Sequence, residues 1–532
     1  MSRAVYLISA LAMLFFCACS DKDEGADGEF YAVISRNPEN LDPQMAMDSQ
    51  SMTVIRNTYA LLMDTDGDGR LINGSAESYS VSSDGLVYTF KLRDGLCWFG
   101  YDGRNGVPLT AYDYEYAFQR IFDPDTHSPY TELFSAIKNS RAVYGKVKSI
   151  SELGVKAADE KTLVIELESP DCDFLKLLSH TASAPCNKEL FLSTQGRYGL
   201  SAADCYSCGA FYLSDWNYDP YWNDNHITLE RINCNSTEGY KTYPSLINLE
   251  ITSDRQAQEK KSNFKTDAYI SDSFAHYDKE TAKDYEIKEY VNESSCLFLS
   301  ADFEPFSDKN VRKALYSSIG RETLKEALSE DSVYSDNIIP PSITVSNKSF
   351  RELFPLTERT FSGSKSLWKN MLAEYPSIDF NSSTLLVSDE LNSQPLSYAI
   401  TADFQKELDL YCQAVFMNES DYRKALSAEE HILSIDTVDC GVNLSEAFLE
   451  AVYERSGYED SEFEAMLSQI RQCPDLNTKK DMVSKAENYL IDNAYVLPLS
   501  FEKKYLLTLK DTRDIYYDPY TETMLFKYAK KD

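Results

Sequence analysis

Two kinds of hydrophobic spacing alternate along this chain, and they constrain its fold more than any other feature. Apolar residues recur at every second position in residues 86–93 and 163–167, the spacing of half-buried strands. Between them, Thr110 and Asp113 have the spacing of a helix-capping pair, and an apolar helical stripe follows before Pro124 ends it. Similar helical stripes follow Asp308 and run through 482–490. Because strands and helices are interleaved, the sequence predicts a mixed α/β (α+β) fold rather than a bundle or a sandwich.

Length and charge limit the classes of protein that remain. The chain has 532 residues, and since single cores stop growing at about 250–300 residues, two or three domains are expected. A formal net charge of −33 argues against a nucleic-acid partner, because a polyanion would be repelled and no basic stripe compensates. The five histidines are scattered, and no zinc-binding pair, nucleophile elbow, Walker loop or dinucleotide-binding turn is present. We therefore predict a protein that is not an enzyme and needs no metal or cofactor.

Two short patterns suggest sites that we do not assign. Residues 64–69 have the acidic spacing that opens an EF-hand loop, but Ser75 stands where a bidentate Glu is required, so a tight turn between strands is predicted. Cys205 and Cys208 have CxxC spacing without a second such pair, which favours a loop disulfide or two inert thiols over a metal site. The spacing of the cysteines does not fix any disulfide pairing.

The first residues predict where the chain works. Arg3 precedes an apolar run over 4–18, and Cys19 follows directly. The run is shorter than the roughly twenty residues that span a bilayer. Residues 1–19 resemble a bacterial lipoprotein signal, in which Cys19 is acylated and anchors the mature protein to the outer face of the cell membrane, in the periplasm or at the cell surface. In the alternative, Cys17 and Cys19 are incidental in an ordinary cleaved signal.

Five segments in a fixed order then resemble a known family. Asn-Leu-Asp-Pro at 40–43 precedes a predicted helix over 55–62, and the block from 75–95 leads through 108–113 to Asp-Pro-Asp-Thr-His-Ser-Pro-Tyr at 123–130. This order is similar to that of the bacterial extracellular solute-binding proteins of family 5, the oligopeptide-, dipeptide- and nickel-binding components of ABC importers. Residues near 208–216, 311–322, 457–467 and 496–499 extend the resemblance to nearly the full chain. An insertion at 99–105, Ala210 in place of a proline and a missing Gly-Trp near Ser434 depart from the family pattern.

The resemblance implies an architecture and a function. The fold would be a two-lobed, periplasmic-binding-protein type II-like one with an extra inserted domain. Lobe I would comprise 29–65, 185–295 and 501–532, the inserted domain 66–184, and lobe II 296–500. The lobes would close on a peptide by a hinge motion and deliver it, as a monomer, to the permease subunits of an ABC transporter.

The resemblance also implies ligand-binding residues. A peptide's amino terminus calls for a carboxylate; Asp439 is the first choice and Asp436 the second, while the alternative is a loop aspartate that caps a helix over 444–453. Tyr130 would lie near the peptide backbone. The remaining expected contacts are Met47, for which ordinary packing is the alternative, Ser49 and Phe501.

Other readings of the same fold stay open. A solute other than a peptide, such as a nickel chelate, an oligosaccharide or a haem, would keep the fold and the importer role. A surface peptide receptor or chaperone would keep the fold and lose transport.

Overall fold

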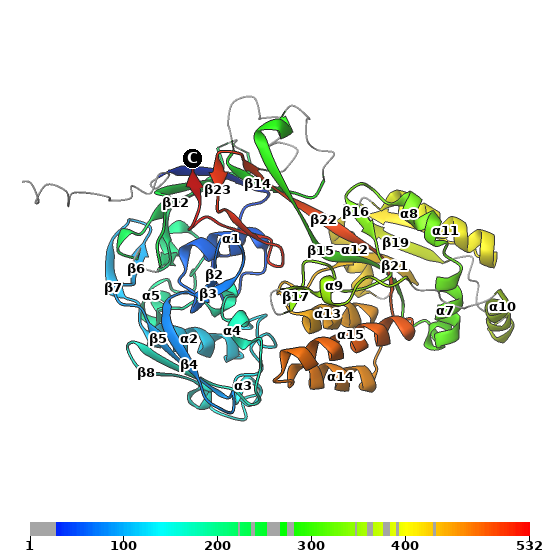
Figure 1. Ribbon diagram of the computed structural model, residues 1–532, viewed down its shortest axis with the longest axis horizontal. Helices are drawn as coiled ribbons and strands as arrows, with labels where there is room; N and C mark the ends of the chain where they lie inside the picture. The colour runs from blue at the N-terminus through cyan, green and yellow to red at the C-terminus, as the bar shows by residue number, and fades with distance from the viewer. Residues whose placement is uncertain are drawn as a thin grey trace, which may run out of the picture.

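The computed structural model describes most of the chain, and Figure 1 gives its outline. The described residues are 28–221, 224–235, 240–252, 266–273, 281–345, 348–358, 365–375, 383–389, 393–428 and 432–532. The predicted signal segment and its Cys19 lie outside these residues.

Two long antiparallel strands join two bodies (Figure 1). These strands are β15, Tyr285–Leu299, and β22, Leu497–Leu509. On one side of the pair, the sheet continues through β14 (Ala268–Ser271), β1 (Glu29–Ile34), β13 (Leu246–Ile251), β12 (His226–Arg231) and β11 (Phe211–Asn217). On the other side it continues through β21 (Leu433–Val438), β19 (Thr384–Ser388) and β20 (Gln413–Met417), while β16 (Ser332–Tyr334) pairs with β22. One sheet therefore passes through both bodies.

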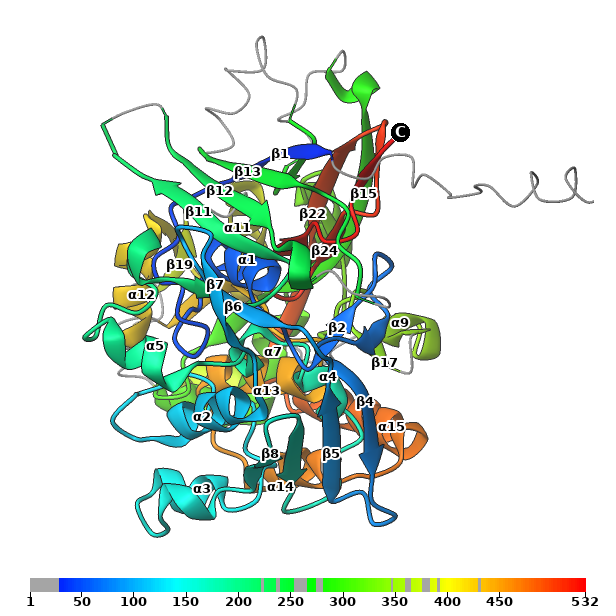
Figure 2. The same cartoon turned by 90° about the vertical axis from the view of Figure 1, so that its left-hand side faces the viewer.

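A separate four-stranded sheet lies in the first body, at the bottom of the view in Figure 2. Its order is β4 (Ala76–Val81), β5 (Val87–Leu92), β9 (Thr162–Glu166) and β8 (Val155–Asp159), and α2 (Ala111–Phe122) packs on β8 and β9. The other elements before β15 are short: α1 (Ser49–Thr58), β2 (Met63–Thr65), β3 (Leu71–Asn73), β6 (Cys97–Gly100), β7 (Asn105–Pro108), α3 (Ser140–Tyr144), α4 (Phe174–Leu177), α5 (Lys188–Ser193) and β10 (Tyr206–Ser207).

The second body has helices on both faces of its sheet. Side chains alternate along β15, so Leu297 and Leu299 join one apolar cluster while Cys296 and Phe298 join another. The first face carries α7 (Lys309–Ser317), α10 (Lys365–Glu374) and α11 (Gln394–Leu408), and the second carries α13 (Ser445–Ser456), α14 (Ser461–Arg471) and α15 (Leu476–Asp492). The other elements of this body are α8 (Arg321–Ala327), β17 (Thr344–Val345), β18 (Lys348–Ser349), α9 (Phe350–Leu353) and α12 (Glu419–Ser427). The chain then returns to the first body and ends with β23 (Thr512–Arg513), β24 (Tyr516–Asp518), β25 (Thr523–Leu525) and β26 (Lys530–Lys531).

The expected lobe boundaries fall on the two connecting strands. Ser295 pairs with Ser500, and the register shifts between Ser295 and Cys296. The boundaries at 295/296 and 500/501 thus lie opposite each other at an irregularity of the ladder, where a sheet bends most readily. The division into domains stays a prediction.

Local expectations can be compared directly with the elements. The strands predicted at 86–93 and 163–167 are β5 and β9, and the Thr110 amide donates to the Asp113 carboxylate (2.9 Å) at the start of α2, as predicted. The acidic segment 64–69 begins in the last two residues of β2 and continues through the tight turn that leads to β3. The helix predicted over 55–62 was misplaced: α1 runs from Ser49 to Thr58, because the Asp48 carboxylate accepts from the Ser51 amide (2.8 Å) and caps it earlier.

Cys205 and Cys208 are free thiols. Both are buried, and burial raises the pKa of each thiol above its ordinary value. Of the two expected forms, the structure has the inert thiols rather than a loop disulfide.

Candidate functional site

Tyr130 and the loop before α1 form one candidate surface of the first body. The Tyr130 hydroxyl donates a hydrogen bond to the Ala46 carbonyl, and its ring meets the His180 ring edge-on at 5.2 Å between centroids. Met47 follows Ala46 and is 70% exposed, while Ser49 begins α1. The structure therefore brings Tyr130, Met47 and Ser49 together, and Met47 is the most exposed of the three.

A buried ion pair holds this loop in place. Arg120 of α2 donates to both carboxylate oxygens of Asp42, at 2.9 and 2.5 Å, and to the Gln44 side-chain oxygen at 2.7 Å. Its guanidinium carbon also lies 4.1 Å from the centre of the Phe191 ring. Burial on its own lowers the pKa of Arg120, but the interactions with Asp42 raise it by more than burial lowers it, so the arginine stays charged.

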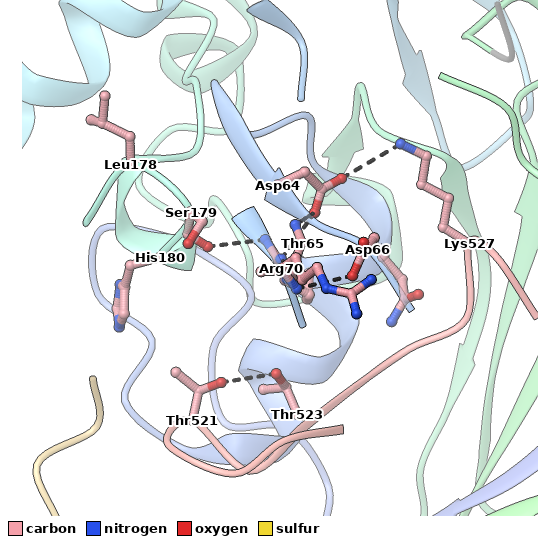
Figure 3. A network of polar contacts seen from close by, with 12 residues as sticks. Asp64, Thr65, Asp66, Arg70, Leu178, Ser179, His180, Thr521, Thr523 and Lys527 are labelled. Atoms are coloured by element: carbon pink, nitrogen blue, oxygen red, sulfur yellow. Dashed lines mark hydrogen bonds and ion pairs between the residues drawn. The ribbon is translucent and has the colours of Figure 1, made fainter. Parts of the chain in front are cut away.

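A second buried network supports the chain before His180, and Figure 3 shows its members Asp64, Ser179 and Lys527. Arg56 of α1 donates to the Ser179 carbonyl (2.9 Å) and pairs with Asp64 (2.9 Å), whose other oxygen lies 3.5 Å from the Lys527 ammonium. Burial lowers the pKa of Lys527 to about 7, while Asp64 opposes the shift. The network ties α1, β2 and the C-terminal segment to the residue before His180.

Asp436 is engaged in ion pairs within the second body. It lies on β21 with only 1% of its side chain exposed, and it forms ion pairs with Arg423 (3.0 Å) and Arg455 (2.9 Å). Burial raises the pKa of the Asp436 carboxyl, and the two arginines act against that shift. This pairing indicates that Asp436 fastens α12 and α13 to the sheet.

Asp439 has a different environment. It follows β21, its side chain is exposed, and its carboxylate accepts from the Gly441 amide (3.1 Å). No cation lies within ion-pair distance of Asp439 among the residues that the structure describes. Crowding by surrounding protein raises the pKa of the Asp439 carboxyl, and the charge of Glu522 raises it further. The helix that follows begins at Ser445, so Asp439 closes a turn and is not the residue that caps this helix.

The segment after Asp439 contacts the first body. Val442 and Leu444 belong to the same apolar cluster as Leu506 and Tyr517. The Tyr520 hydroxyl from the C-terminal segment donates to the carbonyl of Ser342 in the second body. Asp439 therefore lies beside a contact between the two bodies.

One small cavity lies further along this contact. Its volume is about 10 Å³, and its lining includes Asp173, Thr344, Glu446 and Lys479. Since a single water needs roughly 10–15 Å³, this cavity is too small for a peptide.

Phe501 lies one strand away from the residue before Asp439, because Ser294 of β15 pairs with both Phe501 and Val438. It is 0% exposed in β22, where it pairs with Ser294 of β15 and Val333 of β16. In this conformation its ring packs inside the protein. Its expected role as a ligand contact stays a prediction, as do those of the other five residues.

Four polar residues near Asp439 were not expected from the sequence. Lys504 lies on β22 among Asp272, Glu293 and Glu522. The signal in the sequence is charge within long strands, but β15 and β22 carry other charged residues besides Glu293 and Lys504, so charge alone does not single these two out.

This fold, with two helix-covered bodies joined by a strand pair, defines the class of two-lobed solute-binding proteins. The model of the bacterial extracellular solute-binding proteins, family 5 (middle region), matches residues 70–406, so the chain belongs to that family. The family resemblance and the fold class expected from the sequence are both confirmed. Its members are extracellular binding proteins.

Individual relatives support the same assignment over nearly the whole chain. Oligopeptide-binding protein OppA of Bacillus subtilis is 24% identical over 537 residues, 94% of each chain. The probable deoxycholate-binding periplasmic protein YgiS of Escherichia coli is 24% identical over 489 residues, 88% of this chain and 86% of its own. The crystal structure of a periplasmic oligopeptide-binding protein from Borrelia burgdorferi superposes with a TM-score of 0.75 at 24% identity, covering 95% of this chain and 100% of that one. Within the described residues, no helix is both long and apolar enough to cross a membrane.

Proposed function

We propose that this protein is the substrate-binding subunit of an ABC importer, which captures peptides between its lobes and passes them to a membrane permease. The name of the Bacillus subtilis relative, an oligopeptide-binding protein matched over 94% of both chains, supports a peptide ligand. The protein acts as a monomer, held to the outer face of the membrane by a lipid on Cys19, and it carries out no reaction on its ligand.

The exposed Asp439 carboxylate is the observation that carries the peptide assignment. It lies beside the contact between the lobes and has no ion-pair partner among the described residues. A free peptide amino terminus is a cation with three donors, and it would supply the missing charge. Asp436 already has two arginine partners, which leaves Asp439 as the better anchor.

The domain division follows the same proposal. Lobe I comprises 29–65, 185–295 and 501–532, the inserted domain 66–184, and lobe II 296–500. Closure bends β15 and β22 near Ser295 and Ser500, and it brings Asp439 toward the Tyr130, Met47 and Ser49 surface.

The deoxycholate-binding relative suggests a second candidate ligand. Deoxycholate is a carboxylate, and the acidic surroundings of Asp439 and Glu522 disfavour an anion at this position. We therefore place peptides first.

Mass spectrometry of the ligand that copurifies with the gently isolated protein tests this function. Calorimetry then compares a mixture of short peptides with deoxycholate on the ligand-stripped protein. We expect copurifying peptides and saturable peptide binding. A protein that binds deoxycholate, or a metal chelate, oligosaccharide or haem, and no peptide would contradict the proposal while leaving the fold assignment intact.

A further inference from the structure

A charged cluster lies where the two connecting strands meet the C-terminal segment. The Lys504 ammonium of β22 lies 2.8 Å from Asp272, 3.3 Å from Glu293 of β15 and 3.2 Å from Glu522. Glu522 lies in the turn between β24 and β25, with a positive φ of 53° that few non-glycine residues adopt. Segments more than two hundred residues apart thus converge on one ammonium group.

The acids in this cluster outnumber the cations. Asp272, Glu293 and Glu522 surround Lys504, and Asp439 adds a fourth carboxyl whose charge acts on Glu293. Burial raises the pKa of Glu293 to about 8, the Lys504 charge opposes this shift, and Glu522 and Asp439 strengthen it. One ammonium is therefore too little positive charge for these carboxyl groups.

Tyr517 gives a second and independent indication. Its side chain is 0% exposed, and its hydroxyl has no hydrogen-bond partner within the described part of the chain. The hydroxyl lies within the electrostatic reach of Glu522, Lys504 and Glu293, and its ring meets the Tyr290 ring edge-on at 4.8 Å. Buried hydroxyls nearly always have partners, so an unpaired one within the electrostatic reach of a group of acids points to a missing donor or acceptor.

The geometry favours an organic cation over a metal ion. A metal site needs three or more carboxylate, thiol or imidazole groups whose ligand atoms lie close together. Among the described residues Asp171, Cys172 and Asp173 meet this condition, and the cluster around Lys504 does not. A guanidinium or an alkylammonium does not need such convergence, because its N–H groups point outward to separate acceptors. The side chains of Glu522 and Glu293 are 30% and 15% exposed, so both can be reached from solvent.

We propose that Glu293, Glu522 and Tyr517 form a subsite for a basic side chain, Arg or Lys, of the bound peptide. This proposal rests on the peptide-binding function proposed above and deepens it by naming the substrate class, peptides that carry a basic residue. The guanidinium or ammonium donates to the two carboxylates and to the Tyr517 oxygen, while Asp439 remains free for the amino terminus. Lys504 stays in place, and its charge offsets the repulsion among the surrounding carboxylates.

Arginine and citrulline peptides provide the direct test, because the two side chains have nearly the same shape and differ in charge. Calorimetry on the wild-type protein should give about tenfold or tighter binding of the arginine peptide. The preference for the arginine peptide should fall in both the Glu522→Gln and the Tyr517→Phe variant. In Glu522→Gln the two peptides should bind with nearly equal affinity. Thermal melting shows whether each variant is folded.

Glu289→Gln is the matched control. Glu289 lies on β15 as Glu293 does, but it is exposed and faces Lys503 at 3.6 Å, so the variant should keep the wild-type preference. Equal wild-type affinity for arginine and citrulline peptides would overturn the subsite and leave peptide binding intact. Absence of binding to any peptide would overturn the proposed function and the subsite together.

Discussion

Lys479 of α15 in the second body donates to Asp173 of the first, with 2.6 Å between its nitrogen and the carboxylate oxygen. The same ammonium lies 2.6 Å from Glu446 and is 3% exposed. Burial lowers the pKa of Lys479, but the charges of Glu446 and Asp173 raise it by more than burial lowers it, so the pKa of Lys479 lies above its usual value. Nearby, the Lys176 ammonium donates to the Thr344 carbonyl (3.2 Å) across the same contact. These bonds join the bodies in the conformation described and are lost if the bodies separate.

Asp173→Asn should therefore shift the protein toward an open form. Lys479 keeps Glu446, so we expect a loss of about 1–3 kcal/mol from the closed state rather than the full cost of an unpaired buried charge. Small-angle X-ray scattering on the ligand-free variant should give a larger radius of gyration than the wild type, and saturating ligand should reduce it.

Asp125→Asn is the control for this variant, because Asp125 pairs with Lys146 at 3.1 Å on the surface of the first body, with both side chains exposed. Scattering curves that superpose for wild type and Asp173→Asn, with and without ligand, would contradict both the closing motion and the role of the Lys479–Asp173 ion pair in holding the bodies together.

Asp439→Asn should weaken peptides that have a free amino terminus. In the closed complex the lobes would cover this pair, and removing one partner of a buried charge pair costs about 3–5 kcal/mol, which at 1.4 kcal/mol per tenfold is about two orders of magnitude or more in Kd. N-acetylated peptides should be affected much less, since they bring no ammonium. Calorimetry on both peptide forms measures the difference.

The control is Asp421→Asn, an exposed acid on α12, which should change neither affinity. If Asp439→Asn weakens free and acetylated peptides equally, Asp439 serves only to hold its turn through Gly441. The same comparison would then be applied to Asp436.

The sequence predicts local elements well because hydrophobic spacing and caps are local properties. The strands at β5 and β9 and the start of α2 follow from alternation and from the Thr110 and Asp113 pair. The misplaced α1 is instructive: the predicted helix over 55–62 began too late, because the Asp48 cap sets the first turn.

The candidate site was less predictable, because burial and pairing depend on distant segments. Asp436 and Asp439 are three positions apart and look alike in sequence, but two arginines from different helices reach only Asp436. Likewise, Glu293 and Glu522 meet only because β15 and β22 pair and the C-terminal segment returns to them. Strand register of this kind leaves no trace in local spacing.

Cys19→Ala should release the protein from the membrane fraction. The proposed lipid on Cys19 is the anchor, and within the described residues no helix is suited to cross a membrane. Cell fractionation with immunoblotting measures the effect, and Cys17→Ala is the control that should remain bound. A membrane-bound fraction unchanged by Cys19→Ala would leave the lipoprotein assignment without support.

His180 should remain neutral far below the usual range for histidine. Burial lowers the pKa of His180 to about 4, with Arg56 adding a smaller repulsion, and its Nδ1 accepts from the Ala182 amide (3.1 Å). Because the folded pKa is below the unfolded value of about 6.5, the stabilisation is fully present above pH 6.5 and is lost as the pH falls toward 4. The difference between the folded and unfolded pKa values of His180 corresponds to about 3 kcal/mol of folding stability, at 1.36 kcal/mol per pKa unit.

NMR titration of the imidazole protons tests this directly, with His180→Asn to identify the signal, since the Asn oxygen can still accept from the Ala182 amide. The exposed His127 provides a second imidazole signal for comparison. Because the His180 ring packs against Tyr130, protonation near pH 4 should also disturb the proposed peptide surface and weaken binding there. A His180 signal that titrates near pH 6.5 would contradict the buried, neutral state.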